Sequence, residues 1–295
     1  MRISGLSVNL KSFNVIHRTS NTYDKLLTQM SSGMKISKAS QDPMLAQKSV
    51  YLHNLKNDNV QFKKNATDAK SLIDYTESII GQAGDLLTRV KELAVRAATD
   101  TINNESREAI VKEVDQIILE ITNMGNQQYN GKYLFSGTNT TTKPFEIVGD
   151  PPTAITYHGN GESVKVNISE TSKIASNVPG NSVFLEALNN IITVRDDIKD
   201  GNIENITNNG FDLIEKSIDT LINARTELGA KSNIIETTIS RIAAMDLELE
   251  SSYSSLMGVN IAEKQIELAS VEVSYQASLS VVSKLHSMSI LNYLK

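Results

Sequence analysis

The stretch from residue 45 to residue 97 limits what this chain can fold into more than any other part of it. Read in alternating steps of three and four, it presents an apolar stripe that only Lys48, Asn59 and Thr76 interrupt. A straight helix would rotate such a stripe away, so a repeat kept at 3.5 residues must face another helix along its whole length. At 1.5 Å per residue this helix would be roughly 80 Å long, which favours a rod over a compact globule.

The N-terminal segment carries a second apolar stripe with the same spacing. A helix with one apolar stripe and polar flanks can pair with another helix but cannot form a core alone. The Ser- and Lys-rich stretch from Gln29 to Pro43 then indicates a hinge. Asp42 as N-cap and Pro43 at the first helical position begin the long helix. The apolar positions of the N-terminal stripe are Phe13, Ile16, Tyr23, Leu27, Met30 and Met34.

The remaining helical patterns repeat this plan in reverse order. Asn103 or Asn104 caps a helix that is expected to pair with the first long helix, and a second long seam runs from Ile214 to Leu256. Asn260, with Glu263 three residues later, begins a last helix by a capping-box-like start. Its stripe recurs about every 3.6 residues, on one helical face. The stripe consists of Ala262, Ile266, Ala269, Val273, Ala277, Val281, Leu285, Met288 and Leu291.

The pattern changes between residues 132 and 180, where four of the five prolines lie. Short alternating apolar runs there indicate a small β-rich insertion. The Gly159-Asn160-Gly161 turn predicts a hairpin that pairs Ile155 and Tyr157 with residues 164–168. Just before the insertion, Asn130 and Gly131 are expected to give a helix its left-handed stop.

Together these patterns predict a mainly α fold: an elongated rod of long antiparallel coiled-coil helices with paired terminal helices and a small β-rich inserted domain. Two interpretations of the termini stay open. They fold back on the rod as an ordinary bundle, or many copies pack their terminal helices together and order them on assembly. The expected domains are residues 1–42 and 258–295 for the terminal assembly helices, 43–135 and 181–257 for the two parts of the rod, and 136–180 for the outer domain.

Composition and spacing argue against several classes of function. The chain has no Cys and four dispersed His residues, so neither a metal site nor a nucleophile has support, and we expect no enzyme and no cofactor. The net charge of −5 combines +5 on residues 1–40 with −10 on residues 41–257, and this acidic central part argues against nucleic acid as a partner. We expect no membrane insertion and no cleaved signal peptide, because no apolar run or h-region is long enough.

Four stretches, in this order along the chain, resemble bacterial flagellins and flagellin-like hook-associated proteins. They are Ser31–Pro43, Arg89–Ala98, Arg225–Asn233 and Asn260–Leu285. Within that family, Pro43 after Asp42, the sequence NGKYLFSGT at 130–138 and TYHGNG at 156–161 are similar to the hook-filament junction proteins. The resemblance covers residues 1–135 and 210–295, and the insertion is the part that usually varies.

The resemblance implies a structural subunit of the extracellular flagellum, located at the hook-filament junction. Such a subunit self-assembles into a homo-oligomer through its terminal coiled-coil helices, contacts the first hook-associated protein on one side and flagellin on the other, and leaves the cell by flagellar type III export with a chaperone. The expected assembly residues are the six of the N-terminal stripe and Ile266, Ala269, Val273, Ala277, Val281, Leu285, Met288 and Leu291. Two alternatives remain: a filament-forming flagellin, and a helical adhesin or binding module that presents the insertion.

Overall fold

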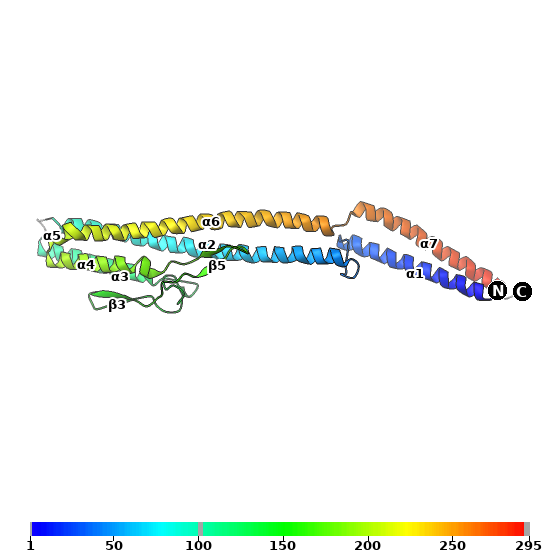
Figure 1. Cartoon of the computed structure of the whole chain (residues 1–295), viewed down its shortest axis with the longest axis horizontal. Helices are drawn as coiled ribbons and strands as arrows, with labels where there is room; N and C mark the ends of the chain where they lie inside the picture. The colour runs from blue at the N-terminus through cyan, green and yellow to red at the C-terminus, as the bar shows by residue number, and fades with distance from the viewer. Residues whose placement is uncertain (1, 100–102, 292–295) are drawn as a thin grey trace. The chain divides into compact units, whose positions relative to one another are not determined.

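The structure is a computed structural model that describes the backbone of residues 2–99 and 103–291 and the side chains of residues 10–99 and 103–284. Long helices dominate it, as the sequence predicts (Figure 1). The helical elements are α1 (Arg2–Ser32), α2 (Pro43–Ala97), α3 (Asn104–Gly125), η1 (Gly180–Ser182), α4 (Leu185–Asp200), α5 (Ile203–Asn205), the π-helical turn η2 (Ile206–Gly210), α6 (Phe211–Met257) and α7 (Ile261–Leu291).

The chain divides into two compact units, and each is described by itself. Unit 1 contains residues 1–58 and 245–295, and unit 2 contains residues 59–244. The continuous apolar core belongs to unit 2, where it runs from Ala66 to Ile235. Unit 1 has few buried apolar side chains among its described residues, chiefly Leu26, Leu249 and Met257.

In unit 2, α2 and α6 run antiparallel. Lys91 pairs with Glu215, Glu77 with Arg225, and Asp74 accepts from Ser232, so numbers fall on α2 as they rise on α6. The predicted seam of α2 is confirmed, because every third or fourth side chain from 66 to 97 is buried. The buried Thr76 that interrupts the stripe donates its hydroxyl to the Leu72 carbonyl, which removes the cost of an unpaired polar group.

The predicted helix starts are confirmed where side chains cap the first turn. The Leu45 N–H donates to the Asp42 carboxylate at 2.9 Å, and the Ser106 N–H donates to the Asn103 side chain at 2.8 Å. The left-handed conformation predicted at Asn130 and Gly131 is also present, with φ of 52° and 76°. However, α3 already ends at Gly125, so these two residues form the turn of a two-residue hairpin rather than a helix stop.

Residues 128–175 contain three separate two-stranded antiparallel pairs, two of them within the insertion, and the predicted hairpin across residues 159–161 is wrong. The strand that contains Ile155 and Tyr157 pairs with the strand before it, and the strand at Val166 pairs with the strand after it. The segment 158–164 connects two hairpins instead of closing one. The strands are β1 (Gln128–Tyr129) with β2 (Lys132–Tyr133), β3 (Phe145–Val148) with β4 (Ala154–Tyr157), and β5 (Lys165–Asn167) with β6 (Lys173–Ala175).

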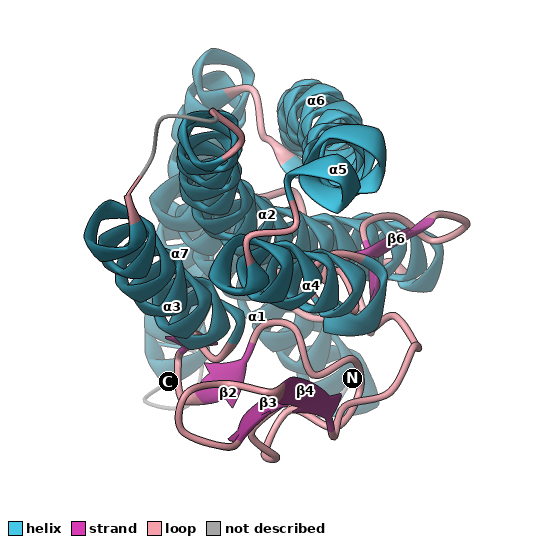
Figure 2. Cartoon of the chain, turned by 90° about the vertical axis from the view of Figure 1, so that its left-hand side faces the viewer, coloured by secondary structure: helices cyan, strands magenta, loops and turns pink. Residues whose placement is uncertain are grey.

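An aromatic cluster holds the β3–β4 hairpin against α3 and α4, which lie side by side in Figure 2. Phe145 is fully buried and packs edge-on against Phe184, with ring centroids 6.1 Å apart. A Cβ atom at Gly125 or Gly180 would lie 2.7 Å from the Phe145 ring, so the close packing depends on glycine at both places. The insertion therefore shares the core of unit 2 rather than forming one of its own.

Candidate functional site

In unit 1, the two terminal helices pack along each other in opposite directions (Figure 1). The less exposed positions of α1 recur at intervals of three and four and define its inner face, with Leu26 only 5% exposed. The matching inner face of α7 contains polar as well as apolar side chains. The inner face of α1 consists of Ser12, Ile16, Thr19, Tyr23, Leu26 and Met30, and that of α7 of Leu268, Val271, Tyr275, Ser278 and Val282.

The stripe predicted for α7 lies on the opposite, outer face of that helix. Ile266 is 74% exposed, Val273 67% and Val281 54%, and Ala269 and Ala277 are also exposed. Because α7 is apolar on two faces, periodicity alone could select the wrong face for packing within the chain. Three more predicted positions, Leu285, Met288 and Leu291, lie outside the residues whose side chains the structure describes.

The predicted stripe of α1 is divided between its two faces. Ile16, Tyr23 and Met30 are partly covered in the pair with α7, whereas Phe13, Leu27 and Met34 remain 40–52% exposed. Leu26, the best buried side chain of α1, was missed because the sequence reading followed its neighbour Leu27. The inner positions of α7 were missed because Ser278 and Tyr275 weaken that stripe. We call the exposed members of the two predicted stripes the outer apolar surface: Phe13 and Leu27 of α1, Met34 of the linker that follows, and Ile266, Ala269, Val273, Ala277 and Val281 of α7.

An apolar groove lies on the surface of the pair, between residues 11–15 of α1 and 277–282 of α7. Its volume is about 350 Å³, and Val15, Val281 and Val282 line it together with Lys11 and the small side chains of Ser12, Ala277 and Ser278. Large apolar side chains exposed in one contiguous region mark an interaction surface on a soluble chain. A side chain of another molecule can insert into this groove.

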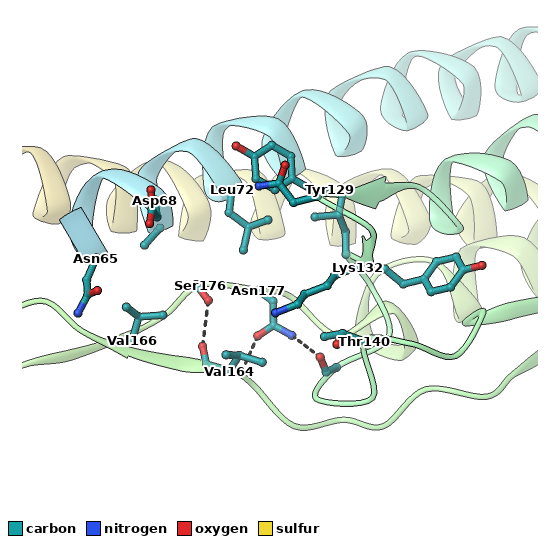
Figure 3. Close-up of a pocket in the computed structure, with 15 residues that line it drawn as sticks. Asn65, Asp68, Leu72, Tyr129, Lys132, Thr140, Val164, Val166, Ser176 and Asn177 are labelled. Carbon is teal, nitrogen blue, oxygen red and sulfur yellow. Dashed lines mark hydrogen bonds between the residues drawn. The ribbon is translucent and has the colours of Figure 1, made fainter. Parts of the chain in front are cut away.

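A second hollow lies in unit 2, where loops of the insertion approach α2 (Figure 3). Its volume is about 440 Å³. The buried Asn177 side chain accepts from the Val164 N–H at 2.7 Å and donates to the Gly137 carbonyl at 3.0 Å, so its polar groups hold the loops together. The charged residues of its lining are Asp68 and Lys132.

Other polar clusters on the described part of the chain fit structural roles. No group of three or more His, Cys, Asp or Glu side chains there could hold a metal ion. Arg89 binds Glu113 and Glu92, and these hydrogen bonds raise the pKa of Arg89 above its ordinary value. Such exposed ion pairs contribute little stability. Among the described residues, no helix is long and apolar enough to cross a bilayer.

The stretches that resemble junction proteins, 130–138 and 156–161, contact each other in unit 2. The Tyr157 hydroxyl donates to the Phe135 carbonyl at 2.8 Å, and burial raises the pKa of this phenol. Asn160 accepts from the Thr138 N–H at 2.8 Å, and a Cβ atom at Gly137 would lie 2.0 Å from the Asn160 side chain. Glycine at position 137 therefore lets the two stretches approach closely.

Comparison with known proteins gives a consistent result at both ends of the chain. The bacterial flagellin N-terminal helical region matches residues 3–140, and the bacterial flagellin C-terminal helical region matches residues 211–294. Flagellar hook-associated protein 3 of Salmonella typhimurium is 22% identical, over 98% of this chain and 98% of its own length. The flagellin of Bacillus subtilis is 24% identical, over 96% of both chains.

A solved structure shares the fold. The structure of a putative flagellar hook-associated protein from Vibrio parahaemolyticus superimposes with a TM-score of 0.67 at 18% identity. The match covers 74% of this chain and 100% of that one. The comparison therefore supports the arrangement of helices and the small strand pairs independently of sequence pattern.

Proposed function

We propose, from the premise that this chain belongs to the bacterial flagellin family, that it is a structural subunit of the flagellum that joins hook to filament. The two matched regions together cover more than half of the chain. The proposed subunit assembles with copies of itself through α1 and α7. The single observation that carries the proposal is the outer apolar surface, whose members Ile266 and Val273 are 74% and 67% exposed in the single chain.

The outer apolar surface supports self-assembly for a physical reason. Burial of apolar area contributes about 25 cal/mol per Å², so exposed Ile and Val side chains stabilise any arrangement in which a neighbour covers them. The inner faces are already occupied by the pair within the chain. A neighbouring copy must therefore use a different patch from the one that pairs α1 with α7. Where the two patches that meet are different, the contact is head-to-tail and generates rings or helical filaments.

The role at the junction rests on more than family membership, because flagellins belong to the same family. Identity does not separate the two roles, at 22% for the hook-associated protein and 24% for the flagellin. The contact between residues 130–138 and 156–161 favours the junction role, since the stretches that resemble junction proteins form one packed unit. A filament-forming flagellin is the second candidate, because the sequence identities to the two kinds of protein are similar.

The proposed role extends to location and partners. The subunit lies outside the cell in the flagellum, after type III export without a cleaved signal peptide. It contacts the first hook-associated protein and flagellin, and an export chaperone covers the C-terminal helix beforehand, because exposed apolar stripes would otherwise associate in the cytoplasm. In this arrangement residues 1–42 and 258–295 assemble, the two rod segments 43–135 and 181–257 surround them, and residues 136–180 face outward.

Self-assembly is tested by electron microscopy of the purified full chain concentrated in a salting-out buffer, which strengthens apolar association. Monomers or short rings that cap isolated hooks are the expected result. Long filaments that seed their own growth would instead make the chain a flagellin. A chain that stays monomeric and does not bind hooks would contradict both readings.

A further inference from the structure

The two linkers of unit 1 are joined by a short antiparallel bridge between Met34 and Gly258. The Lys35 N–H donates to the Met257 carbonyl at 2.7 Å, and the Val259 N–H donates to the Gly33 carbonyl at 3.0 Å. One linker leads from α1 into α2, and the other leads from α6 into α7. The bridge therefore ties together the points at which both long helices connect to the terminal pair.

The side chain of Lys35 adds a contact of a different kind. Its ammonium group donates to the Ser255 and Leu256 carbonyls, both at 3.0 Å. These carbonyls belong to the last turn of α6, where no following helical N–H is available to them. A positive charge there also interacts favourably with the negative end of the helix dipole. Lys35 thus caps a helix whose end is some 220 residues further along the chain.

Lys35 is itself held by the end of α1. Its carbonyl accepts from the amide of Gln29, which is only 8% exposed. The main-chain N–H and the ammonium group of this one residue therefore bind the end of α6, while its carbonyl binds α1. Lys38, in the same linker, has no side-chain partner among the described residues and is a natural control.

The break between α6 and α7 depends on local geometry that a continuous helix would not need. A Cβ atom at Gly258 would lie 2.4 Å from the Ser254 carbonyl oxygen, so the observed turn excludes other residues. Asn260 then caps α7. Residues 258–260 contain no proline, so nothing in them forbids an unbroken helix once the contacts that favour the break are lost.

We propose that Lys35 is a positioning residue for assembly. By capping α6 it stabilises the turn that separates α6 from α7. This turn sets the direction in which α7 presents its part of the outer apolar surface. The consequence for assembly rests on the proposed function, whereas the effect on the break does not. Copies can associate only while α7 points in the competent direction. Loss of the cap lowers the fraction of chains in which α7 points in the competent direction, and association weakens in proportion to that fraction.

The effect on the break is measured by electron spin resonance on the full chain. Because the chain has no Cys, Ser251→Cys and Gln276→Cys place one label on each helix at exposed positions. The parent is expected to give one narrow distance distribution. Lys35→Met removes only the ammonium contact and should broaden this distribution, because the geometry of the break is then held by the backbone bridge alone. Lys35→Arg and Lys38→Met should resemble the parent.

The effect on assembly uses the same variants without labels. Lys35→Met should raise the concentration needed for half-maximal sedimentation about two- to fivefold, the factor that an exposed charge at a helix end can supply, while Lys35→Arg and Lys38→Met match the parent. An unchanged distance distribution in Lys35→Met would overturn the proposal, as would a changed distribution with unchanged assembly. If the parent neither associates with itself nor binds hooks, the proposed function fails, and the distance measurement still decides whether Lys35 holds the break.

Discussion

At the scale of single residues, Arg195 is the only charged side chain that is buried in the described part of the chain, with 2% exposure. Its guanidinium group binds Asp115 of α3, Asp196 of its own helix and the Pro152 carbonyl beside the β3–β4 hairpin. These three partners all belong to unit 2. Arg195 therefore fastens the insertion to α3 and α4, together with the Phe145 cluster.

Replacing Arg195 by Met is expected to lower the free energy of unfolding of unit 2 by about 3–5 kcal/mol, because Asp115 stays behind as a partly buried carboxylate without its cation. Urea unfolding followed by circular dichroism measures the loss. Lys199→Met, one turn further along α4 and exposed, should stay within about 0.5 kcal/mol. Adding Asp115→Leu to Arg195→Met should recover part of the loss, and a double variant no better than the single one would argue against the ion pair.

At the scale of elements, α1 and α7 each present two apolar faces with different tasks. Residues of the same type that lie close together in the sequence differ in exposure, so they make matched pairs. Leu26 is 5% exposed and Leu27 42% exposed, while Val271 faces α1 and Val273 is 67% exposed. The inner faces hold the chain's own pair together, and the outer apolar surface is left for neighbouring copies.

An Asp on the outer face is expected to stop assembly and leave the monomer intact. Leu27→Asp and Val273→Asp should keep the helicity and melting temperature of the parent, because their side chains already contact water. In sedimentation and microscopy both should remain monomeric, since each assembled contact would bury a carboxylate.

The matched inner-face variants should behave in the opposite way. Leu26→Asp and Val271→Asp bury a carboxylate inside the pair, so the melting of α1 and α7 should shift to lower temperature in the monomer. If outer-face and inner-face variants behave alike, the division of the two faces is wrong.

At the scale of the whole molecule, the stability of the two units should differ. Unit 2 has a continuous core, whereas unit 1 buries few apolar side chains in its described part. Native-state hydrogen exchange should therefore find amides in residues 10–32 and 261–284 exchanging at least about tenfold faster than those in 66–97. Assembly should slow the hydrogen exchange of amides in the terminal helices more than that of amides in unit 2. Equal protection of all these segments in the monomer would contradict the difference in core size.

Much of the fold could be predicted from sequence because its signals are local. The seam of α2 and the caps at Asp42 and Asn103 depend on spacing within one helix or on contacts a few residues apart. The strand pairing could not be predicted in this way. Each run at 145–148, 154–157 and 165–167 can pair with either neighbour, and only the packing of Phe145 against Phe184 and the glycines decides between them.

For the candidate site, the apolar stripes of the terminal helices could be predicted from sequence, because helical periodicity needs no tertiary information. Only the tertiary structure decided which stripe of α7 faces α1, since two faces of that helix are apolar and the partner chooses between them. The same holds for Lys35 and Arg195. Each is an ordinary basic residue in the sequence, and each acquires its role from groups that folding brings from distant parts of the chain.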